Sequence, residues 1–108
     1  MALLHEDLVL FDVEAADREE LLTKLANVLR EKGYVKDSYP QAILEREAAY
    51  PTGLNTKGIA IAMPHAAAAH AVEAAILVAR LKHPVTFKEM GGTGKDVPAR
   101  LVFMLSID

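Results

Sequence analysis

The chain contains no cysteine among its 108 residues. This absence excludes disulfide bonds, metal sites built on thiolates and catalysis by a cysteine nucleophile. A protein without disulfides also suits a reducing compartment, since disulfides form and persist mainly in oxidising ones.

Long hydrophobic runs are also missing. The first residues, MALLHEDLVLF, have neither the basic region nor the sustained apolar region of a signal peptide. The longest weakly polar stretch, residues 58–71, is interrupted by Pro64, His65 and His70. It falls short of the roughly 20 apolar residues that a membrane helix needs. We therefore expect a cytoplasmic protein that is not inserted in a membrane.

A strong excess of one charge is absent as well. Lys and Arg number 12 against 15 for Asp and Glu, which gives a formal net charge of −3, and the basic residues form no block. The overall field therefore does not attract nucleic acid or an anionic membrane, and we expect no nucleic-acid partner. Neither serine, Ser38 or Ser106, lies in a G-x-S-x-G motif, and no G-x-x-x-x-G-K-[ST] phosphate loop occurs. No cofactor is expected.

The strongest local pattern is a helix that follows a first strand at 8–13. Asp17 suits the N-cap, and Glu20 lies three residues later, as a capping box requires. Gly33 offers the left-handed conformation that ends such a helix. Between them, apolar residues at helical spacing predict one buried stripe. These residues are Leu21, Leu22, Leu25, Val28 and Leu29.

The rest of the chain predicts a second helix and further strands. The helix starts near Ser38, holds Pro40 in its first turn and ends at about Ala49, before the turn Pro51-Thr52-Gly53. The sequence GIAIAM, residues 58–63, predicts a strand covered on both faces. The remaining predictions are strands at 75–81 and 99–107, a short edge strand at 84–89 and a turn at 91–94. We thus expect one α/β domain over residues 1–108, with a mixed sheet flanked by helices.

His65 is the candidate nucleophile on grounds of position. It follows Pro64 at the end of the predicted strand at 58–63, and ligands in open α/β sheets bind beyond the carboxyl ends of strands. A rigid strand end also holds a side chain precisely. A metal site shared with His70 is disfavoured, because five residues on a helix place two side chains about 140° apart. We therefore predict no metal site.

A second candidate segment runs from Arg46 to the Pro51-Thr52-Gly53 turn. An arginine at a helix end, a hydroxyl and backbone N–H groups together suit an oxyanion or a phosphoryl group. An ordinary surface arginine and a turn that stops a helix fit the same residues. The spacing alone leaves both readings open.

Taken together, the segments REAAYPTG and GIAIAMPH and the alanine-flanked His70 resemble a known family. They are similar to the IIA domains of the fructose–mannitol class (type 2) of the bacterial phosphotransferase system, and most similar to the galactitol type. The resemblance extends to KGYVKDSYPQAILEREAAYPTGL, PVTF and LVFMLSI, and so to nearly the whole chain.

This resemblance implies a phosphocarrier enzyme. His65 matches the family histidine that takes a phosphoryl group from phosphohistidine on HPr and passes it to a cysteine of the partner IIB, which serves sugar uptake through the membrane component IIC. Arg46 matches an arginine that faces the active site. Thr52, Gly53 and His70 are expected to contribute phosphate or partner contacts, although His70 fits a helix surface equally well. By resemblance, Nε2 is the phosphorylated nitrogen.

The resemblance also raises two departures. Full-length members continue into C-terminal helices, so we expect a C-terminally truncated domain that lacks them; without that cover, the strand at 99–107 favours oligomerisation or instability. Ala66 stands where many members have glycine. A regulatory, nitrogen-type IIA protein and an inactive remnant stay open as alternatives to the transport component.

Overall fold

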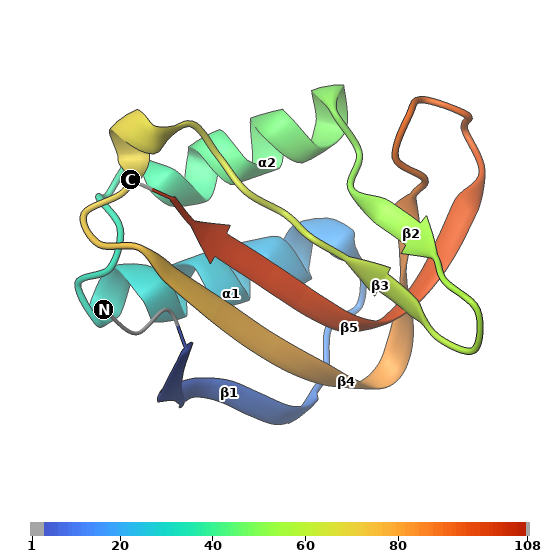
Figure 1. The fold of residues 1–108 in the computed structure, drawn as a ribbon, viewed down its shortest axis with the longest axis horizontal. Coiled ribbons are helices and arrows are strands. Elements are labelled where there is room, and N and C mark those ends of the chain that lie inside the picture. Colours follow the sequence, from blue (N-terminus) through green and yellow to red (C-terminus); the bar gives the residue numbers. More distant parts are fainter. Residues whose placement is uncertain (1–3, 108) are drawn as a thin grey trace.

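The computed structural model describes residues 4–107 and contains a mixed five-stranded sheet with two α-helices (Figure 1). The elements are β1 (Leu4–Val13), α1 (Arg18–Glu31), α2 (Tyr39–Ala49), β2 (Gly53–Asn55), β3 (Ala60–Ala62), the 3₁₀ helix η1 (Ala68–His70), β4 (Ala75–Lys88) and β5 (Asp96–Ser106). The strand order is β1-β4-β5-β3-β2. β1 is parallel to β4 and β3 to β5, while the other two pairs are antiparallel. The predicted α/β class with a mixed sheet is confirmed.

The start of α1 shows why its boundary was readable in the sequence. Asp17 is extended, and its side chain accepts the N–H of Glu20 at 2.8 Å. Glu20 in turn accepts the N–H of Ala16 at 3.1 Å, one residue before the position that a standard capping box uses. The first interaction satisfies a backbone donor that the first helical turn leaves free, and the second holds the residue before the N-cap.

The end of α1 is a Schellman motif. Gly33 has a φ of +84°, a conformation that glycine adopts without the clash of a Cβ atom. The N–H of Gly33 bonds to the carbonyl of Arg30 at 3.1 Å, and the N–H of Tyr34 bonds to that of Leu29 at 3.0 Å. The predicted C-terminal glycine is therefore confirmed.

Both helices lie on the same face of the sheet (Figure 1). On β4 the side chains of Ala75, Leu77 and Ala79 are buried, whereas the intervening Ile76 and Val78 are only half-buried, as expected when alternate residues face opposite sides. The apolar stripe of α1 fills the space between the layers. Its buried members are Leu21, Leu22, Leu25, Ala26 and Leu29, while the predicted Val28 is half-buried.

The strand that precedes His65 differs from its prediction. β3 covers only Ala60–Ala62, and Ile59 is 38% exposed. Gly58 has a φ of +97° and lies in the connection from β2 to β3. The expectation of a strand covered on both faces is wrong, because the two helices lie on one face of the sheet only. The short β2 was not predicted at all.

β4 also differs from its prediction. The predicted strands at 75–81 and 84–89 form one strand, with a register shift against β5 between Arg80 and Val85. β1 pairs with β4 only as far as Leu81. Pro84 lies beyond that point, so its missing N–H removes no bond to β1. In the described part of the chain, no helix is long and apolar enough to cross a membrane.

Candidate active site

The backbone around His65 is held against the central strand β5. Pro64 is buried, and its carbonyl accepts the N–H of Leu105 at 2.9 Å. His65 itself forms an isolated parallel bridge with Leu105. The histidine thus lies just past the end of β3, on backbone that a second strand fixes, and its side chain is half-buried.

The ring of His65 is oriented by its own backbone. Nδ1 lies 3.0 Å from the carbonyl oxygen of Met63. A carbonyl oxygen only accepts hydrogen bonds, so this contact requires the proton on Nδ1. In the neutral ring, Nε2 then carries the free lone pair. The contact therefore leaves Nε2 as the ring nitrogen with the free lone pair.

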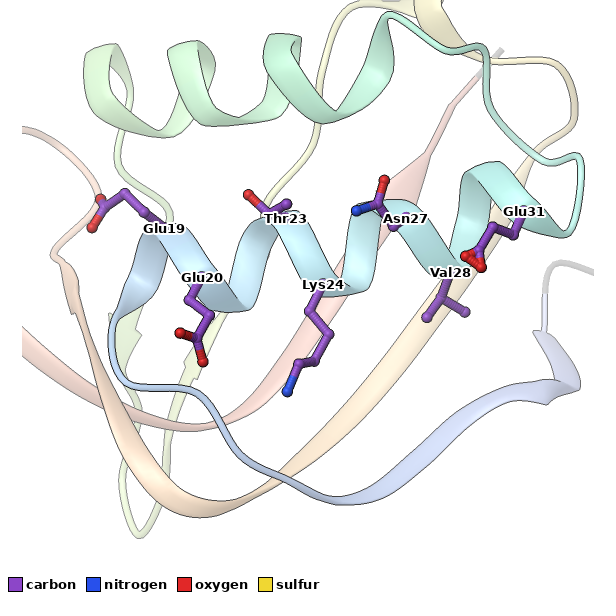
Figure 2. A pocket seen from close by; sticks show the side chains of 7 residues that line it. All are labelled: Glu19, Glu20, Thr23, Lys24, Asn27, Val28 and Glu31. Carbon is purple, nitrogen blue, oxygen red and sulfur yellow. The ribbon is translucent and has the colours of Figure 1, made fainter.

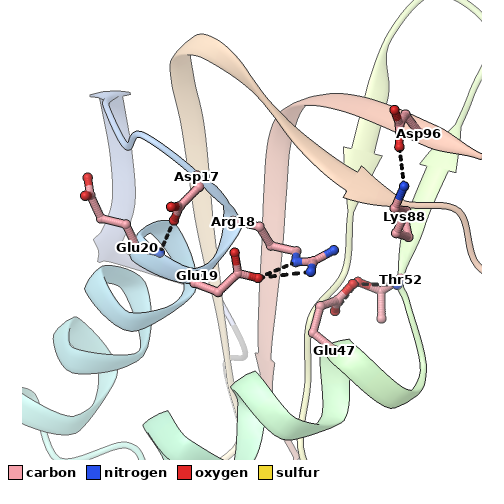
Figure 3. Close-up of polar contacts among 8 residues, drawn as sticks. All are labelled: Asp17, Arg18, Glu19, Glu20, Glu47, Thr52, Lys88 and Asp96. Atoms are coloured by element: carbon pink, nitrogen blue, oxygen red, sulfur yellow. Dashed lines mark hydrogen bonds and ion pairs between the residues drawn. The ribbon is translucent and has the colours of Figure 1, made fainter.

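A buried polar pair lies next to this backbone. Glu47 and Thr52 are each 2% exposed. The backbone N–H of Thr52 donates to Glu47 Oε2 at 2.8 Å, and Thr52 Oγ1 donates to Glu47 Oε1 at 2.8 Å (Figure 3). Thr52 Oγ1 also accepts the N–H of Met63 at 3.2 Å. These bonds connect the end of α2 and the start of β2 to the residue that contacts His65.

Two residues near this site, Glu47 and Arg18, were not singled out from the sequence. Glu47 follows Tyr39 and Ile43 at four-residue spacing on the buried side of α2, and an acidic residue in an apolar stripe was the available signal. Arg18, the first residue of α1, points toward the Glu47–Thr52 pair (Figure 3) while it also contacts Glu19 at 3.0 Å. No local pattern marked Arg18.

Burial raises the pKa of Glu47 above its ordinary value of 4.5, although hydrogen bonds from Thr52 and the charges of Arg18 and His65 oppose the shift. The folded chain therefore binds this proton more tightly than the unfolded chain. The resulting stabilisation is largest below the unfolded value and is lost as the pH rises through the folded value. We expect the unfolding free energy of the wild type to fall over this range relative to Glu47→Gln, as measured by urea titrations at several pH values. Parallel curves would contradict the shift.

Gly53 has a packing role. A Cβ atom on it would lie 2.6 Å from the carbonyl oxygen of Lys88 and 2.9 Å from Cβ of Val97. Its own carbonyl accepts the N–H of Met90 at 2.8 Å. Only glycine allows the chain to pass this close to its neighbours.

We expect Gly53→Ala to destabilise the fold by about 1–3 kcal/mol, because the added methyl group must displace backbone on β4. Equilibrium urea unfolding measures the loss. Asn55→Ala, an exposed change at the other end of β2, serves as the control and should stay within about 0.5 kcal/mol of the wild type. Equal stability of Gly53→Ala and wild type would show that the close approach is relaxed in solution.

The two other predicted site residues are more exposed. Arg46 lies in the last turn of α2, and its guanidinium carbon is 4.7 Å from the centre of the Tyr50 ring. His70 ends η1, with Nδ1 2.7 Å from Ser38 Oγ. Among the hydrogen bonds of residues 4–107, none joins His70 to His65.

A surface hollow runs along α1 and is separate from these residues (Figure 2). Two of its polar side chains already serve the fold, since Glu20 accepts the N–H of Ala16 and Lys24 donates to the carbonyl of Glu14 at 2.6 Å. The residues that line the hollow are Glu19, Glu20, Thr23, Lys24, Asn27, Val28 and Glu31.

Within residues 4–107, no group of three His, Asp or Glu side chains is placed to hold a metal ion.

Comparison with known proteins identifies relatives over most of the chain. The galactitol-specific EIIA component of Escherichia coli (strain K12) is 38% identical over 96 residues, which are 89% of this chain and 63% of that protein. The transcriptional regulator ManR of Bacillus subtilis (strain 168) is 38% identical over 100 residues, which are 93% of this chain and 14% of the regulator. The chain thus spans less than two thirds of the galactitol relative's length.

The fold has relatives among solved structures. In the complex of enzyme IIAMTL and phosphorylated enzyme IIBMTL from Escherichia coli, the matching chain gives a TM-score of 0.77 at 27% identity, over 94% of this chain and 67% of that one. The family profile for "Phosphoenolpyruvate-dependent sugar phosphotransferase system, EIIA 2" matches residues 2–108. The predicted resemblance is confirmed, and the chain belongs to the EIIA 2 family of the sugar phosphotransferase system.

Proposed function

We propose that His65 carries a phosphoryl group between HPr and a IIB component that serves uptake of a galactitol-like polyol. The observation that supports this most directly is the 3.0 Å contact from Nδ1 to the Met63 carbonyl, which leaves the lone pair of Nε2 free to attack phosphorus. The galactitol-specific EIIA relative supports the substrate class. The solved complex with a phosphorylated IIB supports the kind of acceptor.

The reaction consists of two displacements at phosphorus. The Nε2 lone pair attacks the phosphorus of HPr phosphohistidine, a new N–P bond forms, and the donor's N–P bond breaks as its imidazole leaves with the electron pair. The Nδ1 proton stays on the ring, facing Met63. A cysteine thiolate of IIB then attacks the phosphorus, and Nε2 of His65 is the leaving group. Such transfers depend mainly on positioning and on stabilisation of charge.

The remaining predicted site residues take different parts in this proposal. Arg46 is exposed at the end of α2 and supplies positive charge for the phosphoryl oxygens. Both donors of Thr52 already bond to Glu47, so Thr52 supports the backbone near His65. Gly53 keeps the adjacent strands close. His70 lies on η1 as a partner contact.

The direct test is phosphorylation of the chain with phosphoenolpyruvate, enzyme I and HPr. We expect an acid-labile adduct whose ³¹P and ¹⁵N NMR signals assign it to Nε2 of a histidine. Candidate IIB proteins are then added, and we expect the label to move to a cysteine. Failure of the chain to accept phosphate from phospho-HPr contradicts the proposal.

A regulatory role is the second candidate, and the match to ManR favours it. Regulation and transport share the phosphorylated histidine and differ in the fate of the phosphoryl group. Rapid transfer to a IIB cysteine indicates transport. A phosphorylated form that resists IIB proteins but changes its binding to a regulatory protein indicates regulation.

A further inference from the structure

Glu47 is an unusual residue to find between α2 and the sheet. It is 2% exposed and continues the buried series Tyr39 and Ile43. An ionised carboxylate removed from water costs several kcal/mol unless hydrogen bonds and nearby charge compensate. An apolar residue would avoid this cost. The presence of a carboxylate here therefore indicates a role other than packing.

The hydrogen bonds around Glu47 have a fixed direction. Because a carboxylate oxygen accepts, the hydroxyl of Thr52 must point its proton at Glu47 Oε1. The lone pairs of Thr52 Oγ1 are then left for the N–H of Met63. An acceptor at position 47 therefore fixes the rotation of the Thr52 hydroxyl, with its proton toward Glu47 and a lone pair toward the N–H of Met63.

Met63 is held on both of its backbone polar groups. Its N–H donates to Thr52 Oγ1 at 3.2 Å, and its carbonyl receives Nδ1 of His65 at 3.0 Å. In a neutral imidazole, the hydrogen bond made by one ring nitrogen decides which nitrogen carries the proton and which keeps a free lone pair. A shift of the Met63 backbone would therefore change both the tautomer and the aim of His65.

We propose that Glu47 is a positioning residue, which acts through Thr52 and the Met63 backbone to hold His65 with Nε2 free. This inference rests on the proposed function for the claim that His65 is the phosphorylated group. Arg18, which points toward the pair, offsets the buried negative charge. Glu47 and Thr52 touch neither reactant in this scheme, and His65 alone forms the bond to phosphorus.

The test uses variants of nearly constant shape. Glu47→Gln places an amide N–H₂ against a Thr52 donor, and Thr52→Val removes the hydroxyl while it keeps the size of the side chain. Thr52→Ser restores the hydroxyl. Glu45→Gln is the matched control, since Glu45 lies on the exposed side of the same helix and, within residues 4–107, its side chain bonds only to Gln41 at 3.1 Å.

Two measurements are made on each variant. The rate of phosphoryl transfer from phospho-HPr, corrected for the folded fraction, should fall about 10- to 100-fold in Glu47→Gln and Thr52→Val, since small misplacement of a reacting group has effects of this size. Two-dimensional ¹H–¹⁵N spectra of the His65 ring should show loss of the single Nδ1–H tautomer. Thr52→Ser and Glu45→Gln should match the wild type in both.

The outcomes separate this inference from the proposed function. If Glu47→Gln does not fold, Thr52→Val carries the test. Wild-type rate and tautomer in a folded Thr52→Val overturn the inference, and so does loss of stability without a tautomer change. If wild-type protein accepts no phosphoryl group, the proposed function fails, whereas the ring spectra of the unphosphorylated variants still decide whether Glu47 positions His65.

Discussion

We expect His65→Ala to lose all acid-labile phosphoryl label when it is mixed with phosphoenolpyruvate, enzyme I and HPr. Alanine has no lone pair to attack phosphorus, and no other histidine shares the position of His65 beyond β3 on backbone bonded to β5. Removal of a nucleophile abolishes a covalent step, whereas removal of a supporting group only slows it. Labelling is measured by gel autoradiography after brief incubation at neutral pH, followed by acid treatment of a duplicate sample.

The controls are the other accessible histidines. His70→Ala and His83→Ala should keep the label, since His70 Nδ1 is engaged by Ser38 and His83 is exposed on β4. Circular dichroism of each variant establishes that it is folded. Label retained in His65→Ala, or lost in His70→Ala while His65→Ala is unaffected, would assign the phosphorylated residue elsewhere.

We expect Phe87→Ala to lower the unfolding free energy by about 3–5 kcal/mol, the largest change in stability among the substitutions considered. Phe87 lies on β4, is 0% exposed and belongs to the buried core cluster. Its removal leaves a cavity that the surrounding residues only partly fill. Since domains of this size have a total stability of roughly 5–15 kcal/mol, the variant should show a much lower midpoint in urea unfolding.

Phe11 offers a matched comparison on β1. It is 62% exposed, and its ring lies 4.9 Å from the guanidinium carbon of Arg80. Phe11→Ala loses that cation–π contact and little packing, so we expect a change of about 1 kcal/mol or less. Equal losses in Phe87→Ala and Phe11→Ala would mean that burial in the core cluster does not decide the loss of stability.

The predictions that succeeded from sequence rest on short-range physics. Asp17 and Gly33 marked the ends of α1, because capping bonds join residues three to five positions apart. His65 was placed beyond a strand because Pro64 cannot continue the ladder. The periodic leucines identified the buried side of α1, with Val28 the one member that is only half-buried.

The errors arose where distant segments decide the structure. The break predicted at residues 82–83 vanished, since β5 pairs with β4 on both sides of it, from Ala75 to Lys88. The short β2 forms only because β3 lies beside it. Ile59, just before β3, is 38% exposed, and both helices lie on one face of the sheet only (Figure 1). None of these neighbours is visible in a local window of sequence.

The same distinction between local and long-range interactions applies to the candidate site. The sequence by itself placed His65 just past a strand end, because proline geometry and strand ends are local properties of the chain. Only the tertiary structure decided what holds the ring, since that depends on bonds that join Glu47 of α2 to Thr52, just before β2, and Thr52 to Met63, just after β3. Such bonds form when α2 packs beside the segments that flank β2 and β3. Their strength depends on the distance between donor and acceptor in space, and not on the separation of the residues along the chain.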